Sequence, residues 1–199
     1  VTSIGELAFE GCSSLTSVTI PDSVTSIHNN AFAACNECSE VWIPESVTVI
    51  GDNAFNCSGL ITIFGRGGTA AESYAVANGI EFVSQSWKLD EEGTLTIEGT
   101  GKMFADSMIL WGGKDNVLSI KICEGVTSIA PGAFFDFRNL TTVELPSTLT
   151  CIDYSAFMWC GNLTSVTIQE GVTSIGAQAF YNCTSLASIT IPKSVTMIG

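Results

Sequence analysis

The chain has 199 residues, enough for one large domain or two small ones, and it can bury a hydrophobic core without disulfides. Only 14% of the residues are charged and 46% are hydrophobic, while Ser and Thr fill many polar positions, which favours β structure. The formal net charge of −13 would repel phosphate backbones and anionic lipid, which argues against nucleic acid as a partner. No apolar run approaches the roughly 20 residues that cross a bilayer, so we expect no membrane span.

A repeat with a period of 23 residues runs through two parts of the chain. It is marked by an Ala-Phe dipeptide, which occurs at Ala8-Phe9, Ala31-Phe32, Ala54-Phe55, Ala133-Phe134, Ala156-Phe157 and Ala179-Phe180. The shared unit reads L-T-S-V-T-I-P-x-S-V-T-S-I-G-x-x-A-F-x-x-C-x-x. Units begin at Leu15, Cys38, Leu60, Val117, Leu140, Leu163 and Leu186.

The first residues of each unit predict a short strand. Leu15, Val18 and Ile20 have the spacing of leucine-rich repeats, with alternate apolar residues facing inward, and Pro21 ends the strand because proline cannot continue the ladder. A glycine such as Gly176 then permits a turn, and the Ala-Phe ring fills the interior. Because one unit cannot bury these residues alone, we expect the coils to stack into a parallel β-solenoid.

The sequence resembles the BspA-like leucine-rich repeat proteins of bacterial surfaces. The residues that carry the resemblance are VTSIG at 1–5, VTSI at 126–129, VTSIG at 172–176 and the IP-x-SVT segment at 20–25, together with the AF-x-x-C element. The resemblance implies a right-handed leucine-rich-repeat β-solenoid. It also implies a secreted or cell-surface bacterial protein, associated in that family with adhesion to host proteins or other cells.

The slot that holds Asn in many leucine-rich repeats holds Ser23, Ser46 or Thr148 here, so an Asn ladder is not expected. The sequence also begins at VTSIG and stops at VTMIG, which are the same phase of the repeat. We therefore expect further repeats in the full-length protein.

The pattern is interrupted between residues 63 and 117. Helix-forming residues at 70–79 end in Asn-Gly and predict a short helix, which a strand at 80–83 follows. These two elements would cover the open end of the first array. Residues 87–97 alternate on both sides of a Glu-Glu-Gly turn and predict a hairpin that forms a lid on the second array, with Trp111 packed in that lid.

Three segments follow from this interruption. We expect a first leucine-rich repeat module with its C-terminal cap at 1–84, a β-hairpin lid and linker at 85–116, and a second leucine-rich repeat module at 117–199. The fold is thus predicted as two short arrays separated by a helix-strand cap and a β-hairpin.

Most cysteines follow the repeat. The slot three residues after the Phe ring holds Cys12, Cys35, Cys160 and Cys183. Phe137 fills the same slot in another coil, so the slot is interpreted as apolar and buried, with a column of reduced thiols favoured over disulfides between rungs. Cys35 and Cys38 form a C-x-x-C motif, but the repeat already explains their spacing, so neither a metal nor any other cofactor is expected.

No motif indicates an enzyme. His28 occupies a turn slot that holds Gly in other coils, and no carboxylate or nucleophile is signalled beside it. The glycine-rich segment at 65–69 lacks the Lys of a phosphate loop, and Glu91-Glu92 is interpreted as a solvated hairpin turn.

The outward-facing strand slots are the candidate partner-binding face. These slots hold Ser and Thr in most coils, so Glu40, Trp42, Phe64, Lys121 and Glu144 stand out. Trp42 and Phe64 would lie side by side across rungs, and if exposed they would form a binding anchor. The alternative is that the cap or hairpin folds over and buries them.

These observations predict a non-catalytic repeat protein, secreted or on a bacterial cell surface, that binds a protein or a glycan. Adhesion to host or cell-surface ligands is implied by the family resemblance. The alternative is a structural spacer within a larger surface protein.

Overall fold

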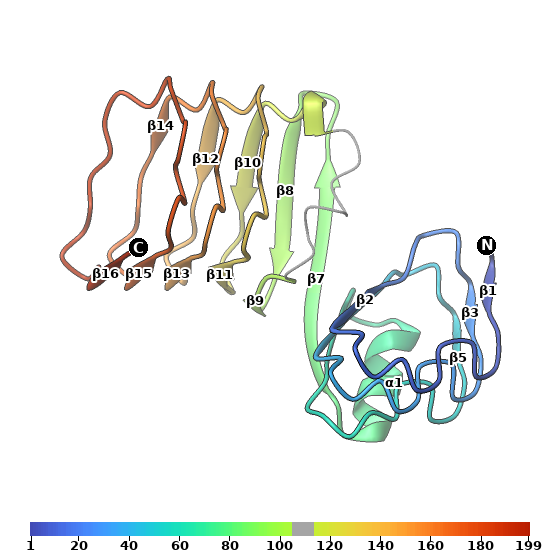
Figure 1. Ribbon diagram of the computed structural model, residues 1–199. Helices are drawn as coiled ribbons and strands as arrows, with labels where there is room; N and C mark the ends of the chain where they lie inside the picture. Colours follow the sequence, from blue (N-terminus) through green and yellow to red (C-terminus); the bar gives the residue numbers. More distant parts are fainter. Residues whose placement is uncertain (105–113) are drawn as a thin grey trace. The chain divides into compact units, whose positions relative to one another are not determined.

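The computed structural model describes residues 1–104 and 114–199, so Trp111 lies outside the described part of the chain. The chain divides into two compact units, Val1–Gln85 and Ser86–Gly199. In each unit, short parallel strands recur at the same points of successive coils, and the coils stack in chain order (Figure 1). The predicted leucine-rich-repeat β-solenoid with a spacing of about 23 residues is confirmed.

The first unit contains two parallel sheets and a helix. One sheet is formed by β1 (Ser3–Ile4), β3 (Ser26–Ile27) and β5 (Val49–Ile50). The other contains β2 (Ser17–Thr19), β4 (Glu40–Ile43), β6 (Thr62–Gly65) and the first residues of β7 (Glu81–Leu89). Helix α1 (Ala70–Asn78) connects β6 to β7, and Gly79 ends it in the left-handed conformation with φ 66°, as the Asn-Gly pair predicted.

The second unit repeats this arrangement. One row of parallel strands consists of β8 (Thr94–Gly99), β10 (Ser119–Ile122), β12 (Thr142–Glu144) and β14 (Ser165–Val166). The other consists of β9 (Gly101–Lys102), β11 (Val126–Ile129), β13 (Cys151–Ile152), β15 (Ser174–Ile175) and β16 (Met197–Ile198). A short 3-10 helix, η1 (Lys114–Asn116), precedes β10.

The predicted hairpin differs from the expectation in two respects. The strand expected at 80–83 does not stop there, because β7 runs without a break to Leu89. Across the turn, β8 is itself the first rung of the second unit, since Thr94 and Ile97 pair in register with Ser119 and Ile122 of β10. The hairpin therefore covers the array by supplying its first coil.

Phenylalanine rings form a stack along the interior of each unit. Phe9, Phe32 and Phe55 are nearly parallel, with ring centres 4.9 and 5.2 Å apart. In the second unit Phe134, Phe157 and Phe180 repeat this stack at 5.1 and 5.4 Å. Each stacked pair contributes roughly 0.5–1.5 kcal/mol beyond the burial of its surface. The Ala-Phe dipeptide thus supplies core residues in the inner coils, as the repeat predicted, whereas Phe9 in the first coil is 44% exposed.

Threonine hydroxyls link the coils where an Asn ladder was not expected. Both the backbone N–H and the hydroxyl of Thr150 donate to the carbonyl of Thr127, and Thr173 donates to Thr150 in the same way. Thr25 and Thr48 repeat this pattern in the first unit. Each bond contributes about 0.5–1.5 kcal/mol to the stability of the stack. These Thr residues form a ladder that links successive coils in the absence of an Asn ladder.

The cap helix completes the last Phe rung of the first unit. Within a stack, the backbone N–H of each ring residue donates to the Ala carbonyl of the next coil, as Phe32 does to Ala54 at 2.8 Å. No such Ala follows Phe55, and its N–H donates to the hydroxyl of Tyr74 on α1 at 3.1 Å. The Tyr74 ring also packs edge-on against the Phe55 ring, with centres 5.9 Å apart. Tyr74 therefore supplies the hydrogen-bond acceptor and the ring contact that a further coil would have supplied to Phe55.

The repeated glycine after the second strand has a different role from the one predicted. A Cβ atom at Gly176 would lie 2.4 Å from the backbone N of Tyr154 in the preceding coil, and one at Gly51 would lie 2.6 Å from that of Asn29. Neither glycine has a positive φ. Gly51 and Gly176 are thus needed where they stand because two coils approach closely there, and turn flexibility is not the reason; other coils hold His28, Ala130 or Asp153 in this slot.

Candidate functional site

Lys121 and Glu144 are neighbours on the outer face of the second unit. Lys121 on β10 is in register with Glu144 on β12, and both side chains are exposed. The same slot holds Thr96 in the coil before and Thr167 in the coil after. The structure therefore brings these two predicted residues together as an opposite-charge pair within a row of hydroxyl side chains.

The other three predicted residues lie in the first unit, and here the expectation of an exposed aromatic anchor is wrong. Trp42 is 4% exposed and Phe64 is fully buried. The register places Trp42 beside Phe64 and Phe64 beside Val83, so each ring has apolar neighbours on the paired strands and loses contact with water. Glu40 is half-buried and in register with Ser17 and Thr62. The structure therefore agrees with the alternative expectation, in which the Trp42 and Phe64 rings are buried.

In three coils the cysteine slot holds a thiol that is bonded to the backbone, whereas Cys12 in the first coil is exposed, contrary to the expectation of a buried slot. The thiols of Cys35, Cys160 and Cys183 each donate to the backbone carbonyl of the core Phe residue in the preceding coil, at 3.2 Å. Cys57, one residue early in its shortened coil, makes the same bond to Phe32 at 3.4 Å. Burial raises the pKa of Cys160 to about 12, which keeps this thiol protonated and unreactive.

The C-x-x-C motif shows the same behaviour. Cys35 and Cys38 are both buried, and burial raises the pKa of Cys38 to about 11. Cys38 donates a weak bond to the carbonyl of Glu40 at 3.8 Å. Within residues 1–104 and 114–199, no group of three or more His, Cys, Asp or Glu side chains is arranged to hold a metal ion. Burial and the raised pKa of Cys38 disfavour the thiolate form that redox or metal chemistry at this motif would need.

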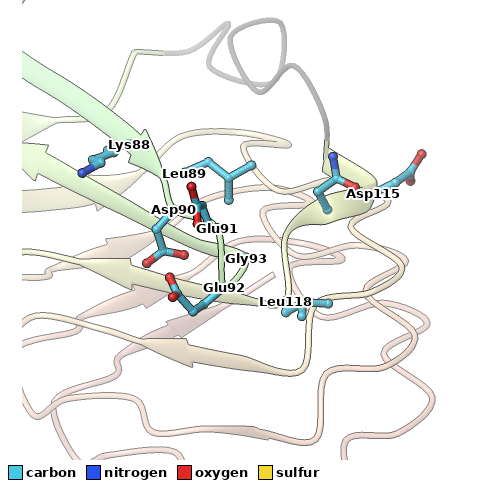
Figure 2. A pocket seen from close by; sticks show the side chains of 9 residues that line it. Lys88, Leu89, Asp90, Glu91, Glu92, Gly93, Asp115 and Leu118 are labelled. Carbon is cyan, nitrogen blue, oxygen red and sulfur yellow. The ribbon is translucent and has the colours of Figure 1, made fainter.

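An acidic depression lies beside the turn between β7 and β8. The depression has a volume of about 870 Å³. Asp90, Glu91, Glu92 and Asp115 are among the residues that line it (Figure 2). Asp90 already accepts a hydrogen bond from the Thr94 N–H at 2.7 Å and so holds the turn. The side chains of Glu91 and Glu92 are exposed, as expected for a solvated hairpin turn.

Another carboxylate, that of Glu124, acts between coils. It accepts hydrogen bonds from the backbone N–H and hydroxyl of Ser147 at 2.9 and 3.0 Å, and from the N–H of Thr148 at 3.2 Å. The bonds to Ser147 are the main reason why the pKa of Glu124 lies below its ordinary value. Glu124 is therefore a structural residue that fastens one coil to the next.

Sequence reasoning missed a group of exposed aromatic side chains on the turns of the second unit. Tyr154, Trp159 and Tyr181 are 51%, 43% and 53% exposed. They flank the Ala-Phe dipeptides, away from the strand slots on which the sequence interpretation concentrated. A comparison of these turn slots from coil to coil would have found them, because the first unit has small or polar residues there.

The family of the chain follows from comparison with known proteins. A model of the BspA type leucine rich repeat region matches six copies, over residues 1–80 and 111–199. No curated protein matches the sequence. No helix in the described ranges has both the length and the apolar character needed to cross a bilayer.

Solved structures of bacterial leucine-rich repeat proteins are also similar. A protein from Bacteroides ovatus is 22% identical over 100% of this chain and 78% of its own, with a TM-score of 0.42. A leucine rich cell surface protein from Faecalibacterium prausnitzii is 26% identical over 98% and 65%, with a TM-score of 0.42. One from Eubacterium ventriosum is 19% identical over 98% and 49%, with a TM-score of 0.40. The family model covers most of the length of the present chain, and the chain therefore belongs to the BspA type leucine-rich repeat family.

Proposed function

We propose that this chain is part of a bacterial cell-surface or secreted protein that binds a protein partner, with adhesion to a host or cell-surface ligand as its role. Leucine-rich repeat proteins are typically non-catalytic and bind other proteins, which supports this class of function. The residue pattern agrees with it, because the inward slots are occupied by the core and only the outward slots are free to vary.

The observation that carries the proposal is the charged pair on the second unit. The fold fills this outward row with Thr96 and Thr167 on either side, so the solenoid itself has no need of Lys121 and Glu144 there. Opposite charges at the centre of a flat hydroxyl row give a partner an oriented pattern of charge. We therefore take this row on β8, β10, β12 and β14 as the binding face.

The test is a surface plasmon resonance screen of the purified chain against a panel of extracellular matrix proteins. We expect at least one to bind, and Lys121→Glu to weaken its affinity by about tenfold, since a reversed charge would meet the partner's complementary charge with repulsion. Lys193→Glu is the matched control. Lys193 is exposed, and its substitution makes the same change in net charge elsewhere in the second unit.

Two results would overturn the proposal. If no matrix protein binds, a spacer role is the better explanation. If Lys121→Glu and Lys193→Glu weaken binding equally, the loss reflects net charge and the β10–β12 face is not the site.

A further inference from the structure

The second unit has an aromatic patch on its turns, consisting of Phe135, Tyr154, Met158, Trp159 and Tyr181. Phe135, Met158 and Tyr181 occupy the same slot in three successive coils, directly after the core Phe ring. Backbone bonds hold these turns together, since the Asp136 N–H donates to Met158 and the Trp159 N–H donates to Tyr181. Three members are about half exposed, and Phe135 and Met158 are partly buried.

The fold does not require large side chains at these positions. The slots of Met158 and Trp159 hold Ala33 and Ala34 in one coil of the first unit, and the slot of Tyr154 holds Asn29. Solenoid coils therefore close equally well over small or polar residues. An apolar group of this extent, left in water beside a complete core, points to a binding surface.

The turn of the repeat sets the backbone conformation at Trp159. Its φ is 68°, and the same slot is left-handed in the coils of Gly11, Ala34, Asp136 and Asn182 as well. Gly and Asn tolerate this conformation better than a bulky side chain does. The repeat therefore accounts for the conformation and accepts smaller residues than the tryptophan at this slot.

The groups around the aromatic patch are polar and carry both signs of charge. Asp136 forms salt bridges with Arg138 at 2.7 Å and with Lys114 at 3.1 Å, and Asp153 accepts a hydrogen bond from the Tyr154 N–H. The Tyr154 hydroxyl donates to the amide oxygen of Gln178 at 2.9 Å. Because neither sign dominates around the patch, it favours an uncharged ligand over a polyanion or a polycation.

We propose that the aromatic patch binds a neutral polysaccharide. The C–H faces of sugar rings stack on flat aromatic side chains, while sugar hydroxyls bond to amide and carboxylate groups such as those of Gln178 and Asp136. Successive coils lie about 4.8 Å apart, close to the advance of one sugar ring in an extended chain, so Phe135, Met158 and Tyr181 can each meet one ring. This site is separate from the charged strand face and stands without it.

The test uses affinity electrophoresis of the whole chain in gels that contain a soluble β-glucan, a mannan or a xylan, with isothermal titration calorimetry for any that retards it. We expect at least one to bind, and Trp159→Asn and Tyr181→Asn each to weaken binding by about tenfold or more. Asn is chosen because Asn182 and Asn56 fill these slots in other coils. Both variants should therefore keep the melting temperature.

Leu60→Asn is the control for loss of exposed apolar surface, since Leu60 is 98% exposed in the first unit. It should bind like the unchanged chain, as should Lys121→Glu, which separates this site from the strand face. Absence of retardation by all three polysaccharides would overturn the proposal. So would binding that survives in Trp159→Asn and Tyr181→Asn, or a patch that binds a protein and none of the sugars.

Discussion

Single residues decide how closely neighbouring coils can approach. Gly176 lies so near the backbone of Tyr154 that even a methyl group would collide with main-chain atoms, which cannot move aside as a flexible side chain can. The Ala of every Ala-Phe pair except the first and the buried thiols occupy the remaining small spaces in the interior. The tightness of the stack therefore depends on a few small side chains at fixed slots.

We predict that Gly176→Ala lowers the free energy of unfolding by roughly 1–3 kcal/mol, because the preceding coil must shift to admit the Cβ atom. Gly161→Ala is the matched control, since its added Cβ would meet only the Thr184 hydroxyl, at an ordinary contact distance of 3.6 Å. Chemical denaturation of both variants measures the difference. Equal stability of the two would show that the coils are less closely packed than described.

Residue patterns in the sequence predict the inside of this molecule better than its outside. The Ala-Phe repeat predicts the ring stack because every coil presents the same environment to it. The burial of Trp42 and Phe64 was not predictable in this way. It depends on which residues cover an outward slot, and the repeat does not specify those residues. Trp159 was missed for the same reason.

At the scale of elements, the end of the first array is closed by α1. Its composition and the Asn-Gly pair predict the helix, but not the hydrogen bond from Phe55 to the Tyr74 hydroxyl. That bond arises because a helix has replaced a coil, and the orphaned N–H needs a new acceptor. The hairpin at the start of the second unit closes its array differently, by making β8 a rung.

We predict that Tyr74→Phe lowers the free energy of unfolding by about 1–3 kcal/mol. The change leaves the buried Phe55 N–H without its acceptor but keeps the ring that packs on Phe55. Hydrogen exchange is the direct measurement, since the Phe55 amide should lose protection. Tyr154→Phe, which removes a hydroxyl exposed to solvent, should leave the Phe55 amide unchanged. Full protection of Phe55 in Tyr74→Phe would contradict the capping role.

At the scale of the whole molecule, the repeat divides the chain into a part that sets stability and a part that is free to bind. The core rings, the Thr ladder and the close glycine slots recur in both units and are the same in kind. The charged pair and the aromatic patch lie in the second unit, on slots whose residue type varies from coil to coil. Sequence alone identifies the first part because it is periodic, whereas the second part is recognised by its departures from the period.

The central claim is that the outward row of the second unit binds a protein partner and contributes little to the fold. The most direct measurement is the affinity and melting temperature of the double variant Lys121→Glu/Glu144→Lys, which keeps opposite charges in register and the same net charge. We predict an unchanged melting temperature and a loss of affinity of about tenfold or more for the matrix protein found in the screen. Unchanged affinity in the folded double variant would contradict the claim.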